Sequence, residues 1–488
     1  MKLFHIAQGT TSIHPLHGNL ISNGARSSVR VAAQMETKQP TLLGHPKGLF
    51  YLAATEAWER FSYYGMTALV VLYMVNQLLL PGHVQHIFGF SGFKAAVESV
   101  VGPLSAQALA SQIFGLYSGF VYFTPLLGGM IADRWIGQRN AVVIGALSMS
   151  AGHIAMGFDQ SFLLALLLLV IGSGFLKGNI SAQVGALYPA EDEARRTRGF
   201  VIFSTAINVG AVIGPLLCGL IAQVYGWHYG FGIAAIFMLF GLATYLYGYR
   251  YLPARVERRK YEGANRLTAV ERRIVVALIA VLIISIFESI AYGQIFNVSS
   301  IWIQQHVALD LGGFRIPVPW FQSINSVFSI ASVPLLFWIW QQQALRGREP
   351  NELAKIGTGA FLACVSNLIP VAAIFLSGPS PVHPVWPFLY SALLGISFLY
   401  YWPTLLALVS RAAPAKMNAT LMGLAFMSLF IANTLVGWIG GFYEKMTPAQ
   451  FWTMHAAIAI VGGALVVLFS RHLSRLLHPV RLSPEFTS

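Results

Sequence analysis

The stretch RYLPARVERRKYEGANRLTAVERR, residues 250–273, is the most charged part of the chain and decides its organisation. Apolar segments of about 20 residues recur on both sides of it, which is the length an α-helix needs to cross a hydrocarbon core. We predict six membrane-spanning helices before this stretch and six after it. Their expected ranges are 47–80, 104–131, 140–158, 161–187, 199–223, 229–250, 273–298, 317–341, 354–377, 384–411, 418–442 and 450–470.

The composition agrees with this organisation. Of the 488 residues, 56% are hydrophobic and only 10% are charged, whereas soluble domains are about 25% charged. The net charge of +13 would suit a nucleic-acid partner, but the basic residues lie in alternate loops, and this excludes that class. The positive-inside rule then places both termini and the charged stretch in the cytoplasm. The basic loops are those around Arg134 and Arg139, Arg195 to Arg198, Arg346 to Lys355, Arg411 to Lys416, and the tail from Arg471.

These observations predict an all-α integral membrane protein with two six-helix bundles. The expected division is a disordered cytoplasmic tail at 1–45, an N-terminal bundle at 46–250, a charged cytoplasmic linker at 251–272, a C-terminal bundle at 273–471 and a cytoplasmic tail at 472–488. We expect a monomer in the cell (inner) membrane. The only cysteines, Cys218 and Cys364, fall inside apolar segments as core residues, and no spacing indicates a metal or cofactor site.

The first 34 residues show no apolar segment of the kind that a secretory signal needs. One interpretation is a transit peptide, because Arg26 and Arg30 flank two serines in an acid-poor stretch. We favour a dispensable tail, with translation beginning at Met35. A protein that starts there should insert and transport like the full chain.

The helix expected at 47–80 contains the polar motif TEAWERFSYYG at residues 55–65. Offsets of three and four residues place its functional side chains on one helix face. An ionised group at the centre of a membrane helix costs at least about 2.5–3.5 kcal/mol, so this face should line a polar cavity in which the charges pair. The alternative is a cluster at a helix end that reaches the lipid headgroups. The side chains are those of Glu56, Glu59, Arg60, Tyr63 and Tyr64.

Lys177 and Glu288 each lie alone within an apolar segment. Isolated charges at such depth mark functional sites by default, although a structural ion pair is the alternative for each. A buried carboxylate can also become neutral by taking up a proton. We therefore predict that Glu288 holds a proton in one state and pairs with Lys177 or Arg60 in another, as coupling to a proton gradient requires.

The segment GGMIADRWIGQR, residues 128–139, closely resembles the signature loop of the major facilitator superfamily, with Asp133 and Arg134 as its conformational charges. Four further motifs resemble the proton-dependent oligopeptide transporters, the peptide transporter branch of that superfamily. They are EAWERFSYYG at 56–65, FLKGN at 175–179, FSTAINVGAVIGP at 203–215 and WFQSIN at 320–325.

The resemblance implies roles for particular residues. Glu56, Glu59 and Arg60 would take part in proton coupling with Lys177 as their cationic partner, and Glu288 would couple proton and substrate. Substrate contacts are implied for Arg60, Tyr63, Tyr64, Tyr122, Lys177, Asn208, Glu288 and Asn325.

The chain departs from the family pattern near the expected substrate. A glutamate that pairs with the peptide amino terminus corresponds to Phe398, a second arginine to Thr67 and a pocket tryptophan to Ala425. Gly178 replaces a proline after Lys177, and Ser289 replaces a glutamine after Glu288. The proton-coupling residues are therefore retained, while the peptide-binding pattern is altered.

The resemblance predicts a symporter that imports di- and tripeptides or closely related solutes with protons by alternating access. The alternative is a proton-coupled transporter of a non-peptide organic solute, because Phe398 replaces the glutamate. An enzyme would need a nucleophile with its base, a metal cluster or a phosphate loop, and a channel would usually show rings of pore-lining charges. Neither pattern is found in the sequence. The expected partners are a small peptide, protons and the lipid bilayer.

Overall fold

The computed structural model describes residues 40–189, 192–253 and 267–477. The chain divides into two units, of which the first ends at Lys47 and the second begins at Gly48. In the first unit, β1 (Thr41–Leu42) and β2 (His45–Pro46) form an antiparallel hairpin. The predictions for residues 1–39, which include Met35, for most of the charged linker and for 478–488 lie outside the described residues.

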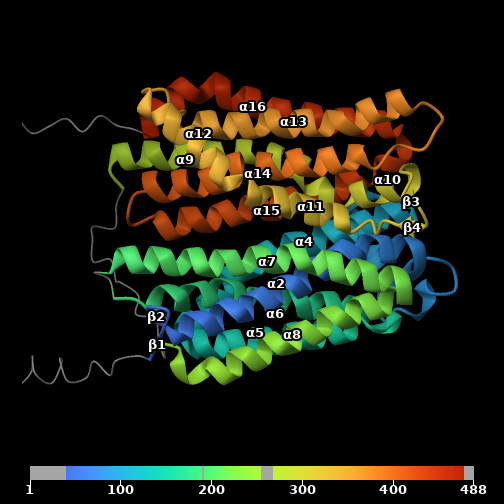
Figure 1. Ribbon diagram of the computed structural model, residues 1–488, viewed down its shortest axis with the longest axis horizontal. Coiled ribbons are helices and arrows are strands. Elements are labelled where there is room, and N and C mark those ends of the chain that lie inside the picture. The colour runs from blue at the N-terminus through green and yellow to red at the C-terminus, as the bar shows by residue number, and fades with distance from the viewer. Residues whose placement is uncertain (1–39, 190–191, 254–266, 478–488) are drawn as a thin grey trace, which may run out of the picture. The chain divides into compact units, whose positions relative to one another are not determined.

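The long helices of residues 48–488 form two sets of six, drawn in blue to green and in olive to red in Figure 1. The first set is α2 (Lys47–Tyr73), α4 (Ala106–Ile131), α5 (Gly137–Ala155), α6 (Phe162–Ala186), α7 (Glu193–Tyr225) and α8 (Trp227–Gly248). The second is α9 (Ala269–Gly293), α11 (Trp320–Ala331) continued by α12 (Val333–Leu345), α13 (Glu352–Ser377), α14 (Val385–Ala412), α15 (Asn418–Gly440) and α16 (Pro448–Leu477).

Length and composition alone identify 10 candidate membrane spans among the described residues, and one of them, Ala106–Ala155, contains both α4 and α5. The helix α2 is not among them, and it carries the three charges of the TEAWERFSYYG motif. Counting α4 and α5 separately and adding α2 gives the twelve predicted helices. A helix satisfies its own backbone hydrogen bonds, as the lipid interior requires.

Among the helices that begin earlier than predicted, α7 and α9 differ most from their expected starts. Thr268 and Glu271 form a capping box that starts α9 at Ala269 rather than at residue 273. The side chain of Asp192 accepts a hydrogen bond from the Arg195 amide, so α7 starts at Glu193 rather than at residue 199. In both cases a polar cap satisfies amide groups that the first helical turn leaves without partners.

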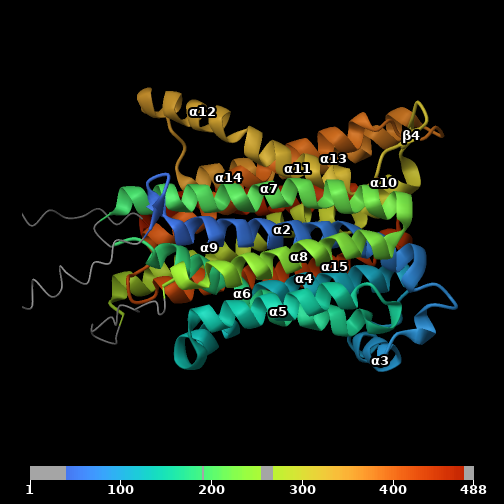
Figure 2. The same ribbon diagram turned by 60° about the horizontal axis from the view of Figure 1, so that its bottom comes forward.

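The helix predicted at 317–341 is divided at Ser332 into α11 and α12. Pro334 lies in the first turn of α12, has no amide hydrogen to donate and clashes with the preceding turn, which explains the break. Figure 2 shows α12 turning away from the helices beside it. Leu335, Phe337 and Trp338 of α12 are exposed, as suits a lipid-facing segment.

Shorter elements lie at one end of the helices. They are α3 (Phe90–Val101), α10 (Val298–His306) and the hairpin of β3 (Asp310–Leu311) and β4 (Phe314–Arg315). We call this the loop end, and we call the other end, where α8 finishes and α9 begins, the linker end. At the loop end the Asp159 carboxylate accepts a hydrogen bond from Tyr73 Oη at 2.5 Å and lies 2.9 Å from His83 Nδ1 and 2.8 Å from His228 Nε2.

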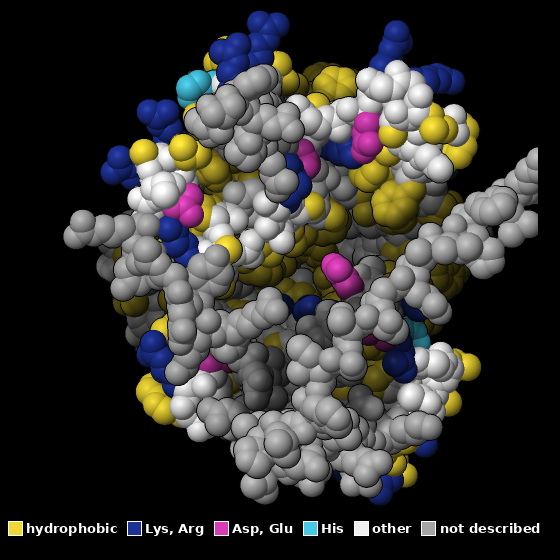
Figure 3. Space-filling model, turned by 90° about the vertical axis from the view of Figure 1, so that its left-hand side faces the viewer, with side chains coloured by type: hydrophobic (Ala, Val, Ile, Leu, Met, Phe, Trp, Pro, Cys, Tyr) yellow, Lys and Arg dark blue, Asp and Glu magenta, His cyan; other side chains and the backbone are white. Residues whose placement is uncertain are grey.

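The two halves are packed together toward the loop end. There α4 packs against α15, and α7 against α11. A Cβ atom added at Gly115 of α4 would lie 2.5 Å from the Gly437 Cα of α15, so only glycine allows this approach. Between α7 and α11, Ser323 Oγ donates to the Val212 carbonyl at 2.8 Å. At the linker end the surface is hollowed between the halves (Figure 3).

Candidate functional site

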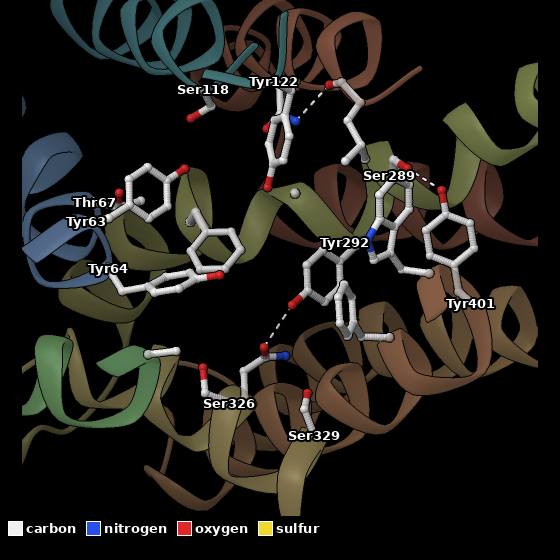
Figure 4. A pocket seen from close by; sticks show the side chains of 18 of the residues that line it. Tyr63, Tyr64, Thr67, Ser118, Tyr122, Ser289, Tyr292, Ser326, Ser329 and Tyr401 are labelled. Atoms are coloured by element: carbon white, nitrogen blue, oxygen red, sulfur yellow. Dashed lines mark hydrogen bonds between the residues drawn. The ribbon is translucent and has the colours of Figure 1, made fainter. Parts of the chain in front are cut away.

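A cavity of about 240 Å³ lies between the two halves. This volume is slightly below the range of about 300–1,000 Å³ usual for small-molecule sites, so the cavity suits a small solute. Its lining comes from α2, α4 and α7 of the first half and from α9, the short turn η6 (Gln294–Phe296), α11, α14 and α15 of the second (Figure 4). The lining residues are Tyr63, Tyr64, Thr67, Phe114, Ser118, Tyr122, Asn208, Ala211, Ser289, Tyr292, Gly293, Phe296, Asn325, Ser326, Ser329, Phe398, Tyr401, Trp402, Leu429 and Asn433.

Five residues that the family resemblance assigned to substrate line this cavity: Tyr63, Tyr64, Tyr122, Asn208 and Asn325. The rings of Tyr63 and Tyr64 meet edge to face, with centroids 5.2 Å apart. Asn325 Oδ1 accepts a hydrogen bond from Tyr292 Oη at 2.9 Å, and Asn325 Nδ2 donates to the Ser391 carbonyl at 3.2 Å. The Asn325 amide is therefore held in one orientation by two neighbouring helices.

The three charges of α2 lie outside this lining and pair with one another. Arg60 Nε is 2.9 Å from Glu56 Oε1 and 2.5 Å from Glu59 Oε2. The residues are 7%, 3% and 0% exposed respectively, so they are enclosed by protein and do not reach toward headgroups. Proximity of this kind offsets the cost of removing charges from water.

Lys177 contacts aromatic rings. Its Nζ lies 4.4 Å from the ring centroid of Tyr63 and 5.4 Å from that of Tyr122, while Arg60 Cζ lies 5.6 Å from the same Tyr63 ring. Among the described residues Lys177 forms no salt bridge. Both tyrosines line the cavity, so cation–π contacts join Lys177 to its wall.

Glu288 lies apart from these cations, in the second half. It is 3% exposed, and Ser397 Oγ donates to its Oε1 at 3.2 Å. Within the described part of the chain it has no salt bridge, and its Oε2 has no hydrogen-bond partner. The predicted pairing with Lys177 or Arg60 is thus absent from this conformation.

The loop between α4 and α5 places Asp133 and Arg134 in a π turn, η3 (Ala132–Ile136), at the linker end. Gln138 Nε2 donates to Asp133 Oδ1 at 2.8 Å, and Arg134 is exposed. Just before the turn, a Cβ atom at Gly128 would lie 2.2 Å from the Gly174 carbonyl oxygen. The glycine therefore lets α4 lie directly against α6.

The profile of the Major Facilitator Superfamily matches residues 61–437. This chain belongs to the major facilitator superfamily. An uncharacterized transporter of Bacillus subtilis is 29% identical over 90% of this chain and 96% of its own. A peptide transporter of Yersinia enterocolitica is 28% identical over 89% of this chain and 96% of its own.

Solved structures give the same result. The crystal structure of a peptide transporter, POT, with sulfate has a TM-score of 0.79 and 28% identity, and the match covers 92% of this chain and 99% of that one. A POT family transporter with 5-aminolevulinic acid has a TM-score of 0.77 and 25% identity, covering 89% and 98%. The predicted fold and the resemblance to the peptide transporter branch of the superfamily are thereby confirmed.

The departures from the branch pattern fall in different surroundings in this superfamily member. Phe398 and Thr67 line the cavity, whereas Ala425 is buried elsewhere and no atom lies near a Cβ placed at Gly178.

Cys218 is buried and Cys364 is half-buried, and both are free thiols.

Several cavity residues were not predicted, among them Tyr292, Phe296, Tyr401 and Trp402. Tyr292 could have been found, because it follows Glu288 by four positions and so shares its helix face. Tyr401 and Trp402 sit among apolar residues, where an aromatic side chain facing lipid looks the same in sequence as one facing a cavity.

Proposed function

We propose that this protein is a proton-coupled symporter that imports di- and tripeptides or closely related small solutes by alternating access. The observation that carries the proposal is the cavity between two halves that are packed together at the loop end and hollowed apart at the linker end. Such an arrangement holds a solute between the halves while exposing it to one side. Relatives named peptide transporters support the substrate class.

The proposal assigns the linker end and both termini to the cytoplasm of the cell membrane, because the basic loops gather there. The proposal keeps the division of the chain into two tails, two bundles and a linker that the sequence predicts. It also includes a monomeric state. The structure then represents the inward-facing stage, and Asp133 and Arg134 act at the cytoplasmic ends of helices that move between stages.

Proton coupling is assigned to Glu56, Glu59, Arg60, Lys177 and Glu288, with Glu288 as the proton carrier. A carboxylate enclosed by protein without a cationic partner is stable when neutral, and it can release its proton when water or a cation reaches it. The cations Arg60 and Lys177 both contact the Tyr63 ring, which lines the cavity. From this position they attract the anionic end of a solute at the cavity wall.

The test is uptake into proteoliposomes that contain the purified full chain. A labelled dipeptide should accumulate above its external concentration when the inside is made alkaline and should only equilibrate without the gradient. Protein-free vesicles and vesicles treated with a protonophore are the controls. Equal uptake with and without a gradient would remove proton coupling from the proposal, and an absence of uptake would remove peptides.

A further inference from the structure

The side chains that line the cavity in the described part of the chain are all neutral. Among the described residues that line it, none is Asp, Glu, Lys, Arg or His. A solute held there therefore meets hydroxyls, amides and aromatic rings. An end group of the solute loses water when it enters the cavity, and the lining decides whether other partners replace that water.

The second half contributes an aromatic wall, which we define as Tyr292, Phe296 and Phe398. The Tyr292 ring is 5.3 Å from the Phe398 ring with 30° between their planes, and 6.1 Å from the Phe296 ring. Phe296 is also 6.5 Å from Tyr64 of the first half, so apolar surface continues across the cavity. Such a surface gains free energy by covering an aromatic or aliphatic group.

The opposite side of the cavity is polar. Asn208 of α7 and Ser326 and Ser329 of α11 line it, and Figure 4 shows the two serines facing the wall that contains Tyr292. These groups can exchange hydrogen bonds with a peptide backbone, but they bring no negative charge to a positively charged amine.

Successive residues of α14 separate the carboxylate from the cavity. Ser397 contacts Glu288 Oε1, whereas the next residue, Phe398, lines the cavity. A Cβ atom at Gly359 would lie 2.9 Å from the same Oε1, which shows how closely α13 encloses the carboxylate. In this conformation Glu288 is therefore held against α13 and α14, outside the cavity lining.

We propose that the aromatic wall is a subsite for an aromatic or bulky apolar group, and that the cavity prefers peptide-like solutes whose amino end is uncharged, such as N-acylated peptides. A free ammonium entering this cavity gives up water for neutral partners, whereas an acylated amine loses far less. This inference rests on the proposed peptide transport and specifies its substrate class, with Phe398 as the residue that determines specificity.

The test compares four unlabelled competitors against uptake of labelled N-acetyl-phenylalanyl-alanine by proteoliposomes. They are phenylalanyl-alanine, alanyl-alanine and the N-acetyl derivative of each. We expect the acetylated aromatic peptide to compete about tenfold better than its free-amine counterpart, and better than acetylated alanyl-alanine. A preference for the free amine, such as cation–π binding to the wall would produce, overturns the proposal.

Substitution of Phe398 makes the test specific. Phe398→Glu should reverse the preference toward the free amine by about tenfold or more, because an ammonium then gains a charged acceptor. Phe398→Gln introduces a side chain of the same size as glutamate but without its charge. This variant should lose the aromatic preference without the reversal. Phe388→Ala is the matched control, because Phe388 lies on the same helix, packs against Phe328 and does not line the cavity.

The two proposals fail in different ways. If no peptide enters the vesicles, peptide transport fails, and thermal stabilisation of the detergent-purified protein by the same four compounds still measures the subsite. If peptides are transported but acetylation and the Phe398→Glu change leave their ranking unaltered, the subsite is wrong and peptide transport stands. Melting curves of each variant without ligand identify those that fail to fold.

Discussion

The two halves of the molecule treat buried charge in opposite ways. In the first half, Glu56 and Glu59 contact Arg60, and Lys177 lies close by on the Tyr63 ring. In the second half, Glu288 has a serine hydroxyl as its partner and no cation among the described residues. The first group is balanced, with two acids and two bases, and can remain charged. The second group carries an excess of one negative charge unless it binds a proton.

The hydrogen bonds around Glu288 agree with a neutral acid. Ser397 has one hydroxyl hydrogen and two acceptors in reach, Glu288 Oε1 at 3.2 Å and the Gly359 carbonyl at 2.9 Å. When the hydroxyl donates to the Gly359 carbonyl, a Glu288 protonated at Oε1 can donate to Ser397 Oγ in turn, so that the Gly359 carbonyl and Ser397 Oγ each accept a hydrogen bond. This difference supports the proposed division, in which the first half keeps its charges balanced and Glu288 of the second half carries the proton.

The largest effect is expected for Glu288→Gln, which keeps the shape of a neutral acid but cannot release a proton. Gradient-driven accumulation should be abolished, while exchange of labelled for unlabelled solute across the membrane should continue. Both are measured in the same proteoliposomes. Intact accumulation would show that Glu288 is structural and that the two halves do not divide these roles.

Arg60→Met should destabilise the protein strongly, because it leaves two enclosed carboxylates without the cation they contact. Removing one partner of a buried ion pair costs about 3–5 kcal/mol, measured as a loss of unfolding free energy in detergent. Adding Glu59→Gln restores the balance with Lys177 and should recover a substantial part of the loss. A double variant no more stable than Arg60→Met would contradict the charge-balance argument.

Lys177→Gln should have a smaller effect on stability than Arg60→Met. Lys177 contacts ring faces rather than a carboxylate, and a cation–π contact is worth about 0.5–2 kcal/mol. Chemical denaturation of the two variants side by side measures the difference. Equal losses would mean that Lys177 balances the acids as directly as Arg60 does.

Ser397→Ala tests the partner of Glu288 in the second half and is expected to have the smallest effect. A neutral hydrogen bond contributes about 0.5–1.5 kcal/mol to stability, so the loss should stay in that range if Glu288 is a neutral acid. The same denaturation experiment measures it. A loss of several kcal/mol would indicate that the hydroxyl stabilises an ionised carboxylate.

The sequence predicted the helices well because lipid imposes a length and a polarity that can be counted along the chain. It missed the starts of α7 and α9, since Asp192 and Thr268 cap these helices from charged segments where hydropathy carries no signal. It also missed the break at Ser332, although Pro334 was visible there.

The candidate site was predicted in part for a similar reason. Tyr63 and Tyr64 share a helix face with charged residues, and that periodicity marked the face as inward. Phe296 and Trp402 have no such neighbours, and the contact of Glu288 with Ser397 joins residues on helices far apart in the chain. Only the packing of α9 against α14 brings that pair together.

A cavity lined without charged side chains also bears on the electrical work of transport. A solute with no net charge adds nothing to the charge that crosses the bilayer with it, and the described side chains that line the cavity add no charge of their own. Each proton carried with such a solute then accounts for one elementary charge moved, on which the membrane potential does about 2.3 kcal/mol of work per 100 mV. For a neutral solute the voltage across the membrane would therefore drive uptake through the proton alone, whereas the carboxylate of an N-acylated peptide would cancel the charge of one proton carried with it.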